Sequence, residues 1–62
     1  MNVTVIATMN GVTLVKFNEE RVCPYAVVRN FDSSDNTWSH AIEYCRDVKQ
    51  AKKVYLEKIE GE

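Results

Sequence analysis

The stretch that decides the fold covers residues 38–59 and reads WSHAIEYCRDVKQAKKVYLEKI. Its second half has the periodicity of an amphipathic helix, because apolar residues recur at spacings of three and four. These residues are Val48, Ala51, Val54, Tyr55 and Ile59, with Leu56 on one flank. Asp47 and Gln50 form a capping box at the start, and Gly61 supplies a stop. A helix of roughly 13 residues is marginal alone in water, so its apolar stripe must pack on another surface.

The first surface available to it is a predicted β-hairpin. Val3–Met9 and Val12–Phe17 have strand composition, and Asn10 and Gly11 lie between them. Asn-Gly in this position predicts a type I′ turn, because both turn residues must adopt positive φ. The register that follows pairs Met9 with Val12, Ala7 with Leu14, Ile6 with Val15 and Thr4 with Phe17.

Both faces of this hairpin are apolar. The more continuous face carries Val3, Val5, Ala7, Met9, Val12 and Leu14, and we assign it to the core beneath the helix. The other face carries Ile6, Val15 and Phe17 among threonines. A single helix covers only one face, so we expect these three side chains to point outward.

Two further strands are predicted. Residues 22–30 form the third, with Pro24 near its start, where a missing amide donor is tolerated. A polar loop follows at residues 31–36. Residues 37–44 form the fourth strand and enter the helix with almost no linker. Alternation separates Trp38, His40, Ile42 and Tyr44 from Ser39, Ala41, Glu43 and Cys45. We place the bulky set against the helix, although Ala41 and Cys45 would also suit close helix packing.

The predicted architecture is a single α+β domain over residues 1–62. An antiparallel β-meander carries one C-terminal α-helix across one face, and a three-stranded variant with an irregular stretch from Trp38 to Tyr44 is the alternative. The formal net charge of −1 gives no general attraction to nucleic acid or anionic membranes. We find no apolar run long enough to span a membrane and no secretion signal, so we expect a cytoplasmic location.

The sequence carries no recognisable catalytic, cofactor or metal site. His40 is the only histidine, and strand alternation turns it away from Cys45. Two cysteines and one histidine lack the paired spacing of a zinc site, and two glycines cannot build a phosphate-binding loop. We therefore predict a non-enzymatic protein without cofactor. We expect Cys23 and Cys45 to be free, partly buried thiols, with a cross-strand disulfide as the alternative.

Nucleic-acid binding is the alternative function. Sheets that bind single strands combine exposed aromatic rings with basic residues. Phe17, Tyr25, Arg29 and Trp38 have the right character for such a platform, and Lys49, Lys52 and Lys53 form a small basic patch. The net charge and the need for the same aromatic rings in a small core weigh against this interpretation.

Trp38, Tyr44, Ala51 and Tyr55 carry a generic family resemblance. In these residues the chain resembles small proteins of phages and other mobile elements that combine a β-sheet with a C-terminal helix. The resemblance implies binding to a host or competitor protein. We therefore predict a protein-interaction module whose partner is another protein or a second copy, as in a homodimer. The candidate interaction surface consists of Ile6, Val15, Phe17, Tyr25 and Arg29.

Overall fold

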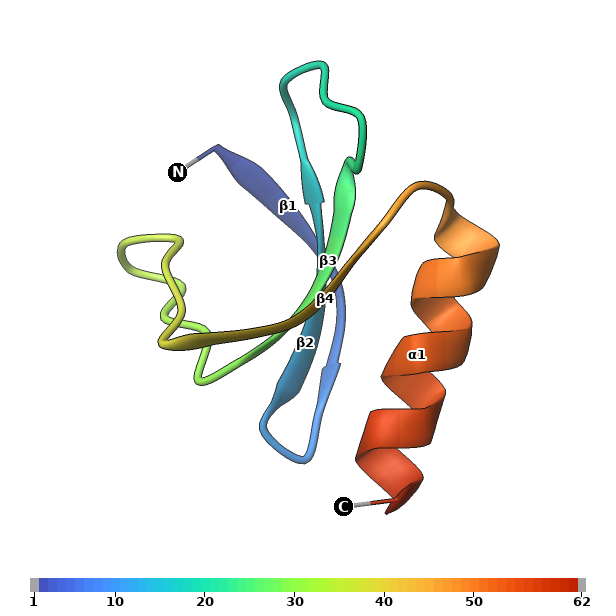
Figure 1. Ribbon diagram of the computed structural model, residues 1–62. Helices are drawn as coiled ribbons and strands as arrows, with labels where there is room; N and C mark the ends of the chain where they lie inside the picture. The colour runs from blue at the N-terminus through green and yellow to red at the C-terminus, as the bar shows by residue number, and fades with distance from the viewer. Residues whose placement is uncertain (1, 62) are drawn as a thin grey trace.

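The computed structural model describes residues 2–61 as one antiparallel sheet with one helix packed on it (Figure 1). The strands are β1 (Val3–Met9), β2 (Val12–Phe17), β3 (Tyr25–Arg29) and β4 (His40–Cys45), and the helix is α1 (Val48–Gly61). The strand order is β1-β2-β3-β4. The predicted α+β meander is therefore confirmed in its four-stranded form. β1 and β2 match their predicted bounds, whereas the third strand is shorter than predicted and the fourth is shifted toward the helix.

The hairpin turn confirms the Asn-Gly prediction. Asn10 and Gly11 have φ values of 54° and 78°, as a type I′ turn requires. Met9 pairs with Val12 and Ala7 with Leu14, again as predicted. The side-chain amide of Asn10 also donates a 3.2 Å hydrogen bond to the Ile59 carbonyl, which ties the turn to the C-terminal end of α1.

The rest of the predicted register is wrong because β1 contains a β-bulge. The pairing shifts between Val5 and Ala7, so Ile6 is an extra residue with no direct partner. Val15 therefore pairs with Val5 instead of Ile6, and Phe17 pairs with Val3 instead of Thr4.

The bulge also moves two valines to the other face of the sheet. Val3 packs with Val15 and Phe17, and Val5 stands directly opposite Val15. Their assignment to the core beneath the helix is wrong. The prediction of Met9 in the same core is also wrong, because its side chain is 55% exposed at the end of the strand.

The first core lies between the sheet and α1. It contains Val12, Leu14, Val27, Cys45, Ala51, Val54 and Tyr55, with Ala7, Tyr25, Ile42 and Ile59 packed at its margin. The predicted helical stripe is thus confirmed for Ala51, Val54, Tyr55 and Ile59, whereas Val48 lies outside this core and Leu56 is half exposed. α1 begins at the predicted cap, where the Asp47 carboxylate accepts a 2.8 Å hydrogen bond from the Gln50 amide. It ends at Gly61, so the residue predicted to stop the helix is its last residue.

The second core lies on the opposite face of the sheet, whose apolar side chains the hairpin pattern predicts to point outward. It contains Val3, Val15, Phe17, Ala26 and Val28, and the partly buried Phe31, Trp38 and Ala41 pack against it. Figure 1 shows why this face is covered: α1 lies on one side of the sheet and the β3–β4 loop lies on the other. The ring centroids of Trp38 and Phe17 are 5.8 Å apart in edge-to-face contact, and Phe31 stacks on Trp38. A loop therefore takes the place of a second helix.

A second bulge corrects the prediction for the fourth strand. The β3–β4 pairing shifts after Val27, which makes Ile42 the extra residue. Ile42 packs toward α1 as predicted, but Tyr44 stacks on Phe17 on the opposite face. Trp38 also lies on that opposite face, whereas Cys45 is buried beneath the helix. The bulky set is therefore divided between the two cores.

Candidate interaction surface

The predicted surface residues do not form one surface. Ile6 is 41% exposed, as expected, but Val15 and Phe17 are only 0% and 3% exposed. The prediction that these two point outward is wrong, because the β3–β4 loop covers their face. Tyr25 is half-buried at the margin of the helix-side core, and Arg29 is half-buried opposite His40.

Half of the exposed large apolar side chains in the described residues lie instead along β1. Val5, Ile6 and Met9 are 44%, 41% and 55% exposed, and all three belong to this one strand. β1 is an outer strand of the sheet, while α1 packs mainly on β2, β3 and β4. An outer strand also presents backbone N–H and C=O groups that no neighbouring strand satisfies. β1 therefore combines apolar side chains with free hydrogen-bonding groups.

The two outer strands differ in charge. The first charged residue after the N-terminus is Lys16, so β1 contains none. β4, at the opposite edge, carries Glu43, and Arg46 follows it directly. Charged side chains are a common protection against strand pairing, so β4 is protected in this way and β1 is not. β1 is protected in a different way, by the bulge at Ile6.

Sequence reasoning did not identify Val5 and Met9 as surface residues. Composition offered one usable signal, which is the absence of charge before Lys16 on a strand that the meander places at an edge. The sequence contains no such signal for the bulge, because every residue of Val3–Met9 is equally compatible with the extra position.

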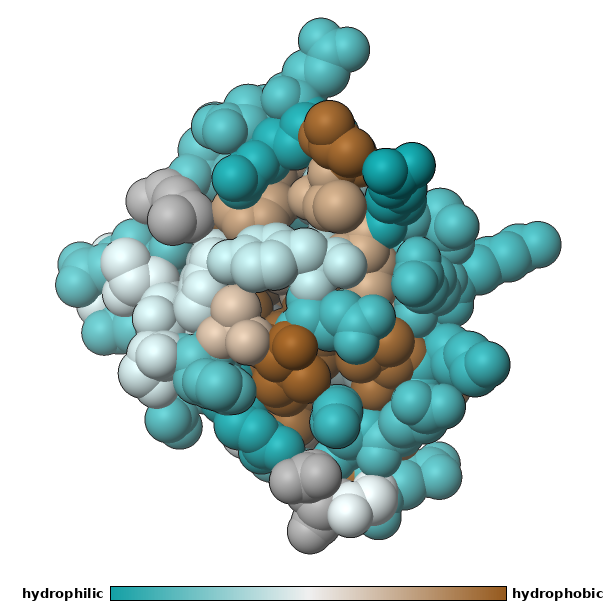
Figure 2. Space-filling model, in the orientation of Figure 1, coloured by the Kyte–Doolittle hydropathy of each residue, from teal (hydrophilic) through white to brown (hydrophobic). Residues whose placement is uncertain are grey.

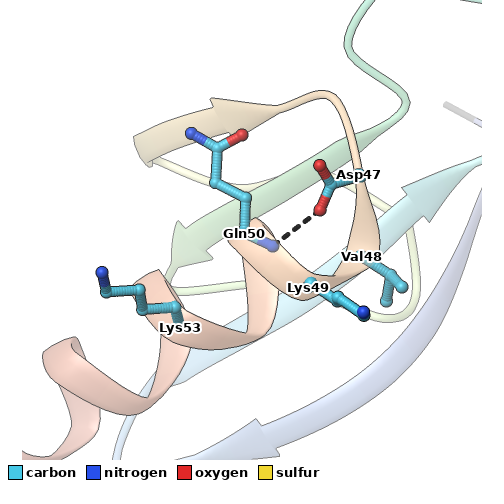
Figure 3. Close-up of a pocket in the computed structure, with 5 residues that line it drawn as sticks. All are labelled: Asp47, Val48, Lys49, Gln50 and Lys53. Carbon is cyan, nitrogen blue, oxygen red and sulfur yellow. Dashed lines mark hydrogen bonds between the residues drawn. The ribbon is translucent and has the colours of Figure 1, made fainter.

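Two shallow hollows mark other parts of the surface. The larger has a volume of about 630 Å³ and is lined by Asp47, Val48, Lys49, Gln50 and Lys53. Figure 3 shows Lys49, Gln50 and Lys53 extending in different directions from the first two turns of α1, while Asp47 caps the first turn. This hollow is open to solvent at the start of α1, and the carboxylate of Asp47 in it already accepts the hydrogen bond from Gln50.

The smaller hollow has a volume of about 380 Å³ and is lined by Arg21, Val22, Cys23 and Tyr44. The Arg21 guanidinium carbon lies 3.9 Å from the centre of the Phe17 ring, and Tyr44 stacks on the same ring at 6.3 Å. Val22 is 75% exposed beside them. Arg21 also pairs with Glu19 at 3.8 Å. The hollow therefore has an apolar floor and a basic rim whose charge is partly compensated.

The view of Figure 2 looks onto the β4 edge. Apolar side chains gather in the middle of this face, between β4 and α1, and polar side chains surround them. Polar groups surround the apolar patch on this edge, whereas β1 has no charged side chain of its own.

The thiols are free, as predicted. Burial raises the pKa of the Cys45 thiol, and the negative charges of Glu43, Cys23 and Asp47 add to this rise. A thiol with a raised pKa is a poor nucleophile at neutral pH. Within residues 2–61, the His, Cys, Asp and Glu side chains form no cluster able to hold a metal ion.

The acidic loop residue Asp32 serves the local turn. Its carboxylate accepts hydrogen bonds from the hydroxyl and the amide of Ser34, at 2.6 and 3.0 Å. These bonds lower the pKa of Asp32. The backbone groups of Asp32 and Thr37 bond to each other across the loop, so the segment that covers the second core is closed at its base.

No protein-family model, curated protein or solved structure matches this chain. In the part of the chain that the structure describes, α1 is the one helix, and it is neither long nor apolar enough to span a membrane.

Proposed function

We propose that this chain is a small non-enzymatic protein-interaction module that binds through the β1 edge. The observation that carries the proposal is the alignment of Val5, Ile6 and Met9 on a charge-free outer strand. Exposed apolar surface on a small domain commonly marks an interaction site. A partner strand would satisfy the free backbone groups of β1, and its side chains would cover the exposed valine, isoleucine and methionine.

The resemblance to small phage and mobile-element proteins gives the biological form of the proposal. On this interpretation the module acts in the cytoplasm and modulates a host or competitor protein. Cys23 and Cys45 support an intracellular setting, because free thiols persist where the environment is reducing.

The test compares three forms of the immobilised protein in extract from the source cell. We expect the wild type and Leu56→Lys to retain the same specific protein, and the double variant Val5→Lys/Ile6→Lys to lose it. Leu56 is a matched control because it is 50% exposed on α1, away from the strand edge. Equal retention by all three forms would place binding elsewhere and overturn the proposed site. A purified chain that binds neither an extract protein nor itself would overturn the function.

A further inference from the structure

We propose that two copies of this chain pair through residues 3–5 of β1 about a two-fold axis at Thr4. This proposal rests on the proposed function and names the second copy as the partner. The product is one continuous sheet of eight strands, four from each copy. Four observations carry it: the strand's position, its lack of charge, the bulge, and the position of the helix end.

Position and charge make a second copy a suitable occupant. A strand that pairs with β1 must have free backbone groups, β-forming side chains and no uncompensated charge. β1 itself has all three properties, and Val3, Thr4, Val5 and Ile6 are β-branched. Because β1 has no charged side chain, two copies meet without like-charge repulsion.

The bulge selects which part of β1 pairs. Ile6 interrupts the alternation of side chains, so the strand offers two regular segments, residues 3–5 and residues 7–9. In the first segment, Val3 and Val5 both lie on the face covered by the β3–β4 loop. Pairing about Thr4 sets Val3 of each copy opposite Val5 of the other, and the two Thr4 residues face each other. The half-exposed Val5 is then covered, and the two loop-side cores become continuous.

The helix end disfavours the second segment. Residues 7–9 lead into the hairpin turn, and Asn10 is bonded to the Ile59 carbonyl near the end of α1. Glu57, Lys58 and Glu60 give this end a net negative charge. Pairing about Thr8 would bring two such ends near each other, which costs free energy.

The charges on β4 limit the assembly to a dimer. Once the two β1 strands pair, both outer edges of the joined sheet are β4 strands that carry Glu43 and lead into Arg46. Charged edge strands resist further pairing. An interface formed by residues 3–5 of each copy is smaller than the approximately 800 Å² per partner of a standard interface. The dimer is therefore weak and reversible.

The first test measures the mass of the purified chain by sedimentation equilibrium. Between about 10 μM and 1 mM we expect the mass to rise from monomer toward dimer and no further, because small interfaces have dissociation constants in this range. Val5→Lys raises the dissociation constant at least about tenfold, since a lysine on this edge opposes pairing. Leu56→Lys, which adds the same charge on α1, leaves it unchanged. A mass that stays monomeric at 1 mM, or that falls equally in both variants, overturns the proposal.

The second test checks the register with single added cysteines. Residues opposite each other in paired strands have Cβ atoms about 5 Å apart, within reach of a disulfide. Under mild oxidation Thr4→Cys forms a covalent dimer in excess of the wild type, whereas Thr8→Cys on the same strand does not. Cross-linking of Thr8→Cys alone, of both variants equally or of neither overturns the proposed register. Because both tests use only the purified chain, their failure leaves capture of a different protein as a separate result.

Discussion

Asp47 shows how one side chain decides where an element begins. Its carboxylate accepts a hydrogen bond from the backbone amide of Gln50. This amide is one of the donors at the start of a helix that have no partner within the helix. We expect Asp47→Ala to lower the free energy of unfolding by about 1 kcal/mol, the usual cost of losing an N-cap. Urea denaturation measures the change. Asp35→Ala also removes one exposed carboxylate but no cap, and its effect stays within about 0.5 kcal/mol.

Cys45 predicts a pH dependence. Burial raises the pKa of this thiol in the folded chain above its unfolded value. The stability contributed by the neutral thiol is therefore fully present below the unfolded pKa and is lost as the pH rises through the folded pKa. At neutral pH we expect an alkylating reagent to modify the half-exposed Cys23 first and Cys45 only on unfolding. Mass spectrometry of tryptic peptides measures the alkylation rates of both cysteines. Equal rates in the folded chain would contradict the burial of Cys45.

Ile6 and Ile42 mark the residue-level limit of sequence reasoning. Each is the extra residue of a bulge, and each reverses the face assignment of the residues beyond it. Alternation and turn chemistry predict the pairs next to the Asn-Gly turn correctly. They cannot locate a bulge in a run of β-branched residues, because moving the extra residue by one position changes no propensity.

At the scale of the element, the β1–β2 hairpin depends on the backbone conformation of its turn. Gly11 has a φ of 78°, and a Cβ built there meets nothing within 4 Å. Gly11→Ala therefore adds backbone strain without a clash, and we expect a loss of about 1 kcal/mol in thermal or urea unfolding. The control is Gly61→Ala at the end of α1, where a Cβ also meets nothing and φ is not positive. A neutral Gly11→Ala would contradict the type I′ turn.

The β3–β4 loop acts as a covering element. Trp38 contacts both Phe17 and Phe31, so truncating it opens the second core. Because Trp38 is partly exposed, we expect Trp38→Ala to cost about 2–3 kcal/mol, somewhat below the value for a fully buried aromatic residue. Val22→Ala, at a 75% exposed position, should cost less than about 0.5 kcal/mol. Equal effects in denaturation would show that the loop does not cover the sheet.

For the whole molecule, the sequence predicts the elements better than their surfaces. The capped helix, the Asn-Gly hairpin and the four-strand meander follow from local patterns that the structure confirms. The candidate site does not follow from local patterns. Phe31 and Trp38 cover Val15 and Phe17, and they belong to a loop whose path depends on tertiary contacts. Because both faces are covered, the exposed side chains of Val5, Ile6 and Met9 lie on the outer strand β1 instead of on an open sheet face.

Amide hydrogen exchange, read residue by residue by NMR at two protein concentrations, tests the role of this edge most directly. Exchange rates report which backbone groups are hydrogen-bonded, and β2 and β3 should exchange slowest because they are paired on both sides. On raising the concentration from about 50 μM to 1 mM, the range expected for a weak dimer, the amides of Val3 and Val5, which point away from β2, should become more protected while those of β4 do not change. Exchange of β1 that is independent of concentration, or added protection on β4 instead, would contradict the assignment of binding to the β1 edge.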